Sequence, residues 1–409
     1  MTPVLALVVT SFGMGYFLSY FLRNVNAVIA PDIVADFSLS ATQIGLMTSV
    51  YFMMAALVLI PIAILLDRYG PRRVLILQLC VAAAGCAIFA RAMSFEALLV
   101  GRALIGLGVA GCLTTAFKAV TVWFPRDRWA TGNSLVLGVG SLGVIAGTQP
   151  LQILLLYVSW REVFLLCAGI SLIVVFVLFV RVPERNAPKA APNSNGIYGK
   201  VLTMRAFWRL MPVASLSMAV FFAIQGLWAN AWLSDVAGLT QTEVGHRLLL
   251  MALAMSMGML INGVLADTLT GLGIPLAAVM SLGILGFLVA VLAITTRFAP
   301  LAWWPWAVMG FTGNIGALGY PLISRRFPAS GSARAMSVLA ASNFTLAFLV
   351  QFSMGWILDL WGRNENGAYP AEAYTVALGA LLGLMSLTFL WFLTSREVWQ
   401  NPKLQEVGQ

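Results

Sequence analysis

Two arginines lie inside stretches of the sequence that are otherwise apolar. Arg23 lies toward the end of the stretch 4–30, and Arg102 lies within the stretch 97–122. If these stretches cross a membrane, each charge is costly there, so the side chains should line a bundle interior or a watery cavity. A guanidinium presents a fixed fork of donors that suits a carboxylate or a phosphate. We therefore predict that both arginines bind an organic anion; the alternative for Arg23 is that it extends to the outer headgroups.

Uncharged polar side chains in similar stretches could bind the rest of a solute. Any one of them is more often engaged in a hydrogen bond between helices than in ligand binding. No Asp or Glu falls near the middle of such a stretch, so proton symport, uniport and exchange all remain open. The candidates for solute binding, in addition to the two arginines, are Asn26, Tyr51, Gln149, Gln225, Trp228, Asn314, Tyr320 and Asn343. Further polar residues of the same kind are Asn133, Asn230, Asn262 and Gln351.

The residue patterns that enzymes use are missing from the sequence. The single histidine, His246, has no neighbouring metal ligands, and its predicted position near the outer surface excludes a Ser-His-acid set. There is no glycine-rich phosphate loop, so ATP is not expected to be the energy source. The four cysteines lie in apolar runs without a CxxC pair, as small core residues do. The sequence therefore predicts no enzyme activity, no cofactor and no metal.

Long apolar runs hold these candidate residues. Of the 409 residues 60% are hydrophobic and 10% are charged, whereas soluble domains have about 45–50% and about 25%, which excludes a soluble protein. A bilayer crossing needs about 20 apolar residues, and helices are expected because the backbone must satisfy its own hydrogen bonds in lipid. The twelve predicted spans are 4–30, 43–66, 74–93, 97–122, 131–157, 162–181, 208–233, 245–266, 275–296, 301–323, 335–358 and 372–394.

Basic residues are distributed unevenly between the loops. Most Lys and Arg residues, for example Arg72, Arg128 and Arg326, fall in loops on the side of the two termini, which predicts that both termini are cytoplasmic. The net charge of +9 then reflects topology, and no nucleic-acid partner is expected. No basic region or cleavage site precedes the first apolar run, so we expect this run to be a retained span and not a signal peptide.

One long polar stretch divides the chain. Residues 183–207 contain several prolines and the turn cluster 193–196, and they predict a cytoplasmic linker whose last part is either a short interfacial helix or a flexible segment. The linker separates an N-terminal six-helix bundle, 1–182, from a C-terminal bundle with a short tail, 208–409. Glycines 101, 106, 108 and 111 have counterparts at 310, 313, 316 and 319. Parallel halves of this kind build one class of secondary transporter, with the solute site expected between them at mid-depth.

The sharpest local motif is Asp67-Arg68-Tyr69-Gly70-Pro71-Arg72-Arg73, between the second and third spans. It resembles the loop 2–3 pattern of the major facilitator superfamily, with Ala63 in place of the leading glycine and Pro71 in place of an arginine. In that family the loop latches the two halves on the cytoplasmic side when the cavity opens outward. The alternative is that the charges only fix the topology. The resemblance implies a gating role for Asp67, Arg68, Gly70, Arg72 and Arg73, and for Asp267 after the eighth span.

Other pieces of the sequence resemble the same superfamily. They are Gly101-Arg102-x-x-x-Gly106-x-Gly108, Trp123-Phe124-Pro125 and Trp160-Arg161-Glu162-x-Phe164. The stretch around Arg23 and Asn26 resembles the Asp-Arg-x-Asn pattern of the anion:cation symporter branch, in which the arginine binds an organic anion; Leu22 replaces the aspartate. For Arg102 the resemblance implies a structural or proton-relay role as often as direct contact with the solute. The stretch 147–150 departs from the Gly-Pro ending of the superfamily's antiporters, which argues against drug/proton antiport.

Together these patterns predict an all-α membrane protein with twelve transmembrane helices in two pseudo-symmetric six-helix bundles, the major facilitator fold. The predicted function is secondary transport of a small organic anion by alternating access, with proton symport as one option. The protein is expected to be a monomer in the lipid bilayer of a bacterial-type inner membrane. The alternatives are an exporter of an apolar or cationic compound and a non-transporting sensor on the same fold.

Overall fold

The computed structural model describes residues 3–184, 197–327, 329–365, 367–395 and 399. All regular secondary structure in this part of the chain is helical. The chain divides into two compact units, Met1–Ala190 and Ala191–Gln409, which are described one at a time. Much of the predicted linker 183–207, and residues 400–409 of the predicted C-terminal tail, lie outside the described residues.

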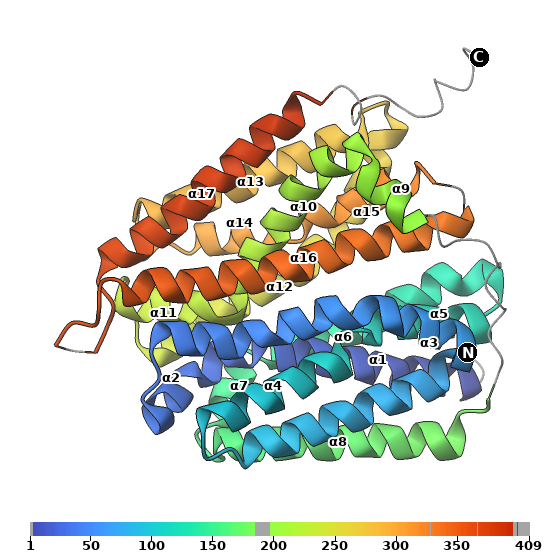
Figure 1. Cartoon of the computed structure of the whole chain (residues 1–409), viewed down its shortest axis with the longest axis horizontal. Coiled ribbons are helices and arrows are strands. Elements are labelled where there is room, and N and C mark those ends of the chain that lie inside the picture. The colour runs from blue at the N-terminus through green and yellow to red at the C-terminus, as the bar shows by residue number, and fades with distance from the viewer. Residues whose placement is uncertain (1–2, 185–196, 328, 366, 396–398, 400–409) are drawn as a thin grey trace. The chain divides into compact units, whose positions relative to one another are not determined.

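Unit 1 is a helical bundle that begins with α1 (Figure 1). Its elements are α1 Pro3–Asn24, α2 Asn26–Phe37, α3 Ala41–Ala90, α4 Phe95–Val109, α5 Cys112–Trp123, a 3₁₀ turn Arg126–Arg128, α6 Trp129–Ala146, α7 Gln149–Leu154 and α8 Trp160–Arg181. α3 packs against α4 and α8, and α1 packs against α5 and α6. The 50-residue α3 is interrupted at Gly70, whose φ of 77° and ψ of 164° are not helical. It therefore carries two predicted spans, 43–66 and 74–93.

Capping residues set where several helices begin. Ser40 accepts a hydrogen bond from the backbone of Gln43 at the start of α3, and the Gln43 side chain accepts one from Ser40 in return. Ser159 and Glu162 form the same capping box at the start of α8. These contacts satisfy N–H groups that a helix leaves unpaired in its first turn. The loops before α3 and α8 therefore end at defined residues.

Glycines let α4 lie close to α3. A Cβ atom at Gly108 would overlap the backbone of Ala82, and one at Gly101 would overlap Phe89. Small residues at such contacts allow the backbones of membrane helices to approach closely. Arg102 lies between these two glycines in the sequence, so the close packing brings its side chain within reach of both α3 and α1.

Unit 2 begins with the short helix α9, Ile197–Thr203, within the stretch for which a short helix was one of two expectations. Its other elements are α10 Arg205–Ala223, a π-helix Ile224–Trp228, α11 Ala229–Asp235, α12 Gln241–Gly271, α13 Leu276–Thr295, α14 Trp304–Thr312, a 3₁₀ helix Ile315–Leu318, α15 Gly319–Ser324, α16 Ala329–Asp359 and α17 Ala371–Leu393. α10 packs against α16, and α12 packs against α14 (Figure 1).

All twelve predicted spans have helical counterparts. Among the described residues, ten helices are long and apolar enough to cross a membrane. α3 is one of the ten although it carries two predicted spans. The predicted span 301–323 is not among them, because it is broken into α14, the 3₁₀ helix and α15. Counting α3 twice and adding the broken span accounts for the twelve.

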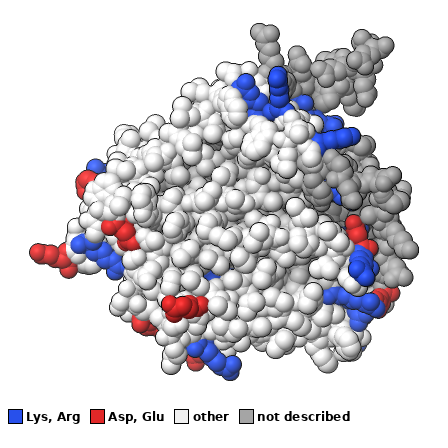
Figure 2. All heavy atoms as spheres, in the orientation of Figure 1, with Lys and Arg blue, Asp and Glu red and all other residues white. Residues whose placement is uncertain are grey.

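Charged side chains lie at the ends of the helices. Figure 2 shows Lys, Arg, Asp and Glu gathered there, and the surface between them is almost free of charge in this view. Large apolar side chains are exposed on the long helices, for example Leu172, Phe176 and Leu387. An apolar exterior of this kind suits contact with lipid, since lipid tails make no hydrogen bonds.

Candidate solute-binding site

The candidate site in unit 1 starts where the first helix is interrupted. α1 ends at Asn24 and α2 begins at Asn26. From α4, Arg102 donates Nη1–H to the carbonyl oxygen of Leu22 at 2.9 Å. In a continuous helix this carbonyl would accept from the residue four positions on, which is Asn26. A side chain that bonds a helix carbonyl is a known cause of such a break, so Arg102 holds the first helix at its interruption.

Three tyrosines surround the two arginines. The Cζ atom of Arg102 lies 5.4 Å from the centre of the Tyr51 ring, and that of Arg23 lies 4.3 Å from the centre of the Tyr20 ring. The Tyr20 ring packs 4.7 Å from that of Tyr16. Arg23 and Arg102 both interact electrostatically with Tyr51. We refer to Tyr16, Tyr20, Arg23, Tyr51 and Arg102 as the arginine–tyrosine cluster.

The cluster carries positive charge in an apolar setting. Arg102 is 1% exposed, and its Nε has no hydrogen-bond partner among the described residues. No Asp or Glu of the described chain is buried, and the five ion pairs recorded there do not include Arg102. A cation removed from water without a counter-charge is unfavourable. Arg102 therefore favours a negatively charged neighbour, which would supply that counter-charge.

Two other predicted residues of unit 1 lie near the interruption. Asn26 is 2% exposed, and its Oδ1 has no hydrogen-bond partner in the described part of the chain. Gln149 is half-buried at the start of α7, two residues after Gly147. A Cβ atom added at Gly147 would lie 3.5 Å from the Cβ atom of Asn24. The structure thus brings Arg23, Tyr51 and Arg102 together. Asn26 and Gln149 lie at neighbouring helix starts.

The predicted solute-binding residues of unit 2 lie on the π-helix, at the start of the 3₁₀ helix, on α15 and on α16. Gln225 is in the π-helix and donates Nε2–H to the sulfur of Met255 at 3.3 Å. Trp228, in the same π-helix, donates Nε1–H to the carbonyl oxygen of Gln351 at 3.3 Å. π-helical turns inside α-helices occur often at functional sites, because the extra residue redirects side chains. Trp228 is thus occupied by a helix–helix hydrogen bond, while Gln225 keeps its carbonyl oxygen available.

Asn343 connects α16 to two other helices. Its Nδ2 donates to the hydroxyl oxygen of Tyr320 at 2.9 Å and to the sulfur of Met218 at 3.3 Å. Asn314 is half-buried next to the 3₁₀ helix, and its Nδ2 has no hydrogen-bond partner among the described residues. The structure therefore brings Asn343 and Tyr320 together, and leaves Asn314 as a donor on the neighbouring turn.

The predicted gating residues of unit 1 form ion pairs at one end of the bundle. Lys118 on α5 donates Nζ–H to Asp67 at 2.9 Å. Arg73 pairs with Glu184 at 2.5 Å. Gly70 supplies the positive φ that lets the backbone turn between these pairs, a conformation that other residues seldom adopt. The loop is therefore tied to both α5 and the segment after α8.

Arg72 holds the carboxyl end of α8. Its Nε and Nη2 donate to the carbonyl oxygens of Leu178 and Phe179 at 2.9 and 2.7 Å. These are carbonyls that the last turn of a helix leaves without backbone partners. Arg68 is exposed and stacks on Tyr69, and Asp267 is exposed on α12 without an ion pair among the described residues. Arg72 thus has a structural role in addition to its predicted gating role.

At the other end of unit 1, α2 is joined to α8. Asp36 accepts hydrogen bonds from Arg161 at 2.6 Å and from the indole of Trp160 at 3.0 Å. These two hydrogen bonds hold the pKa of the Asp36 carboxyl below its usual range. Arg161 also reaches the carbonyl of Ala92. These contacts join α2, the start of α8 and the loop between α3 and α4.

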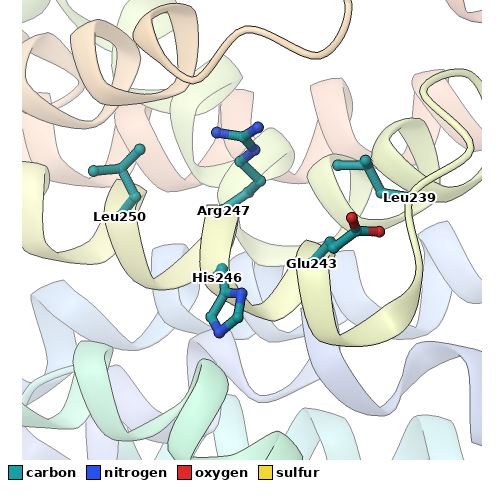
Figure 3. A pocket seen from close by; sticks show the side chains of 5 residues that line it. All are labelled: Leu239, Glu243, His246, Arg247 and Leu250. Carbon is teal, nitrogen blue, oxygen red and sulfur yellow. The ribbon is translucent and has the colours of Figure 1, made fainter.

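A shallow pocket in unit 2 is lined by Leu239, Glu243, His246, Arg247 and Leu250 (Figure 3). Its polar side chains have other partners, because Glu243 caps α12 through Thr240 and Arg247 donates to the carbonyl of Leu301 at 2.7 Å. Figure 3 shows Arg247 and His246 directed to different sides of α12. Because His246 and Arg247 point to different sides, the lining side chains do not converge on one point, and this pocket is a poor candidate for the solute site.

Several contributing residues were not predicted. Tyr16 and Tyr20 precede Arg23 by seven and three residues, a spacing that places all three on one helical face, so this signal was present in the sequence. Met218 and Met255 gave no signal, since a methionine in an apolar helix looks like core. Lys118 and Glu184 became gating-loop partners only through the packing of the bundle.

The family of the chain follows from its sequence together with this architecture. A family described as Major Facilitator Superfamily matches residues 12–316. The chain belongs to the major facilitator superfamily. The predicted all-α membrane fold and the predicted superfamily are therefore confirmed, and this member is a multi-pass membrane protein. The family and the fold are those of transporters.

Curated relatives match parts of the chain. "Uncharacterized transporter YybO" of Bacillus subtilis is 30% identical over 171 residues, 41% of this chain and 39% of that protein. The "Hexuronate transporter" of the same organism is 28% identical over 238 residues, 54% of this chain and 55% of that protein. The "Chloramphenicol resistance protein" of Streptomyces lividans is 26% identical over 244 residues, 59% of this chain and 62% of that protein. The chain thus spans about 39 to 62% of the length of these relatives.

Solved structures match the whole chain. A bacterial homologue of the human lysosomal transporter Spinster, in an inward-facing and unoccupied conformation, aligns with a TM-score of 0.79 at 20% identity. The alignment covers 98% of this chain and 100% of that one. At this identity the similarity establishes the fold alone.

Proposed function

We propose that this protein is a secondary transporter that carries a small organic anion across a bacterial inner membrane. The observation that carries the proposal is the buried Arg102 beside Arg23 and Tyr51. A carboxylate or phosphate group brings the counter-charge that Arg102 lacks among the described residues, and a guanidinium can bind such a group with two parallel hydrogen bonds. The hexuronate transporter among the relatives supports the same solute class.

The remaining predicted residues extend this proposal. Asn26 and Gln149 in unit 1, and Gln225, Trp228, Asn314, Tyr320 and Asn343 in unit 2, are proposed to contribute polar contacts to the solute. Asp67, Arg68, Gly70, Arg72, Arg73 and Asp267 are proposed to act in gating on the cytoplasmic side. Both termini are proposed to be cytoplasmic and the transporter to be a monomer of two six-helix domains. Proton symport is one mode of coupling, and the flux experiment below is run with and without a pH gradient to test it.

Export of an apolar or cationic compound is the second candidate. The chloramphenicol resistance protein among the relatives favours it, and the 18 Met and 24 Phe residues of the chain would supply an apolar lining. A cationic solute would meet repulsion from Arg23 and Arg102, because the described chain offers no buried carboxylate to attract it. The anion is therefore the better fit to the charge of the site.

Flux into proteoliposomes tests the proposal. The purified protein is reconstituted, and uptake of labelled mono- and dicarboxylates, sugar acids and chloramphenicol is measured. We expect uptake of at least one anion, and a loss of about tenfold or more in Arg23→Ala and in Arg102→Ala, since hydrogen bonds to charged groups contribute about 1.5–3 kcal/mol. Arg91→Ala is the matched control, because Arg91 is exposed at the end of α3.

Three outcomes contradict the proposal in different ways. Anion flux that is unchanged when both Arg23 and Arg102 are replaced by alanine would sink the role of the cluster. Uptake of chloramphenicol alone would support the exporter. No flux of any solute, in vesicles that hold correctly folded protein, would support a sensor on the same fold.

A further inference from the structure

Two buried amide side chains in unit 2 each form a hydrogen bond with a methionine sulfur, which is an unusual partner. Gln225 in the π-helix is 5% exposed and Asn343 in α16 is 2% exposed. Each donates an amide N–H to a methionine sulfur at 3.3 Å, Gln225 to Met255 and Asn343 to Met218. Asn343 also donates to the hydroxyl oxygen of Tyr320 at 2.9 Å. The same pairing of an amide with a thioether thus occurs twice in one unit.

The sulfur atoms determine which way the amides point. A thioether has lone pairs and no proton, so it can only accept a hydrogen bond. The NH₂ group of each amide must therefore face its methionine, since the reverse orientation would set two acceptors against each other. The carbonyl oxygens are consequently the atoms left over. Neither Oε1 of Gln225 nor Oδ1 of Asn343 has a hydrogen-bond partner within the described residues.

The two amides lie at two different helix contacts. Asn343 joins α16 to α10 through Met218, and Gln225 joins the π-helix to α12 through Met255. α16 packs against α10, and there the ring of Phe222 stacks on that of Phe344 at 6.3 Å. Trp228 fixes the π-helix to α16 through the Gln351 carbonyl. Each amide is thus held by its own thioether contact, and aromatic contacts join α10 and the π-helix to α16.

We propose that these two oxygens accept hydrogen bonds from O–H or N–H groups of the solute. A buried acceptor without a partner is unfavourable, and a ligand that supplies a donor removes that penalty. This inference rests on the proposed transport of an organic anion and narrows its class. The solute is a hydroxylated or amine-bearing carboxylate, and an aliphatic carboxylate of the same size is a poor substrate. Because both oxygens are enclosed here, the conformation that takes up the solute exposes them.

The ratio of the affinities for two matched anions, one hydroxylated and one not, tests these acceptors. Binding to the purified full chain in detergent is measured for three pairs: gluconate and hexanoate, tartrate and succinate, lactate and propionate. Each pair has the same carbon number and charge and differs only in hydroxyl groups. For at least one pair the hydroxylated member is expected to bind about 10- to 100-fold more tightly, since a site built around a polar group rejects the analogue that lacks it.

Variants locate the discrimination in the two oxygens. Asn343→Leu with Gln225→Met keeps the side-chain volumes and removes both acceptors, so the affinity ratio should fall toward one while the affinity for the unhydroxylated anion changes less than about twofold. Met218→Leu with Met255→Leu keeps both amides and removes only the sulfur atoms that orient them. This double variant should also lower the affinity ratio, but by less. Gln241→Met is the control, since the Gln241 amide is exposed at the start of α12 and donates to Ser234, so its loss should leave the ratio intact.

The two proposals fail in different ways. Arg23→Ala should weaken both members of a pair equally and leave their ratio unchanged. If anion binding depends on Arg23 but every pair has an affinity ratio near one, the acceptor site is wrong and anion transport stands. The same conclusion follows if the ratio is unchanged in the variant that lacks both amides. If Arg23→Ala and Arg102→Ala leave anion binding unchanged, the proposed function is wrong whatever the ratio. If no anion binds to protein that unfolds cooperatively, both are wrong.

Discussion

Arg102 is the residue on which the candidate site depends most. It is buried and cationic, and its recorded hydrogen bond goes to a backbone carbonyl where a carboxylate would be the usual partner. This arrangement leaves part of its charge and its Nε available to a ligand. It also gives the residue two roles, because the same guanidinium holds α1 at its interruption. The two roles can be separated by substitutions that keep one and remove the other.

Arg102→Gln should keep a donor for the Leu22 carbonyl and remove the charge. We expect anion affinity to fall about tenfold or more with little loss of stability. Arg102→Leu removes the donor as well, and should lower the free energy of unfolding by a further ~1–3 kcal/mol, since the Leu22 carbonyl loses its partner. Anion titration and thermal unfolding in detergent measure the two effects. Normal anion binding by Arg102→Gln would show that the residue is only structural.

Asp36 should make the end of unit 1 where α2 meets α8 sensitive to acid. Its pKa in the folded protein lies below the usual value, because Arg161 and Trp160 hydrogen-bond the carboxylate. A lowered pKa stabilises the folded state above the unfolded-state pKa, and this contribution is lost as pH falls through the folded-state value. As the pH falls below about 3.9, the ordinary pKa of an Asp carboxyl, the melting temperature of Asp36→Asn should therefore fall less than that of the native protein. The difference is small, since exposed ion pairs contribute about 0.2–1 kcal/mol; an identical fall in both proteins would contradict the assignment.

Single residues were predicted unevenly. Arg23, Tyr51 and Arg102 could be selected from the sequence because a polar group in an apolar run is conspicuous, and the structure brings these three together. Which polar residues serve helix packing could not be selected, because that depends on partners far away in the chain. Trp228, for example, is occupied by the Gln351 carbonyl, 123 residues further on. The sulfur partners of Gln225 and Asn343 were hidden for the same reason.

At the scale of elements, the positions of the helices were predictable and their interruptions were not. Apolar length marks each span, and turn residues such as Gly70 mark a break. The break of the first helix at Asn24–Asn26 has no glycine or proline of its own between those residues; the Arg102 side chain from α4 supplies a cause. The π-helix Ile224–Trp228 likewise contains no proline, and its Trp228 bonds the Gln351 carbonyl of α16. Such breaks arise from tertiary contacts, so local sequence does not reveal them.

The packing of α4 on α3 yields a prediction with its own control. A Cβ at Gly108 would overlap the backbone of Ala82, so Gly108→Ala should separate the two helices and destabilise unit 1, lowering its unfolding free energy by ~1–3 kcal/mol. A Cβ at Gly138 in α6 would meet no atom within 4 Å. Gly138→Ala should therefore be neutral or stabilising, since alanine favours a helix over glycine. Thermal unfolding of both variants in detergent checks this; equal effects would contradict close packing as the reason for Gly108.

For the whole molecule, the distribution of charge predicts which helix ends face the cytoplasm. The loop at 126–128 is basic, and the loop between α16 and α17 lies at the opposite ends of the spans in the predicted topology. Asp127 and Asn364 are exposed in these two loops. In intact cells a membrane-impermeant maleimide should label Asn364→Cys at once and Asp127→Cys only after the membrane is permeabilised. The native cysteines are a suitable background, because Cys86, Cys112 and Cys167 are buried and Cys80 lies within the apolar part of α3. The reverse labelling pattern would contradict the predicted topology, and would place the arginine-rich loop 67–73 outside the cell.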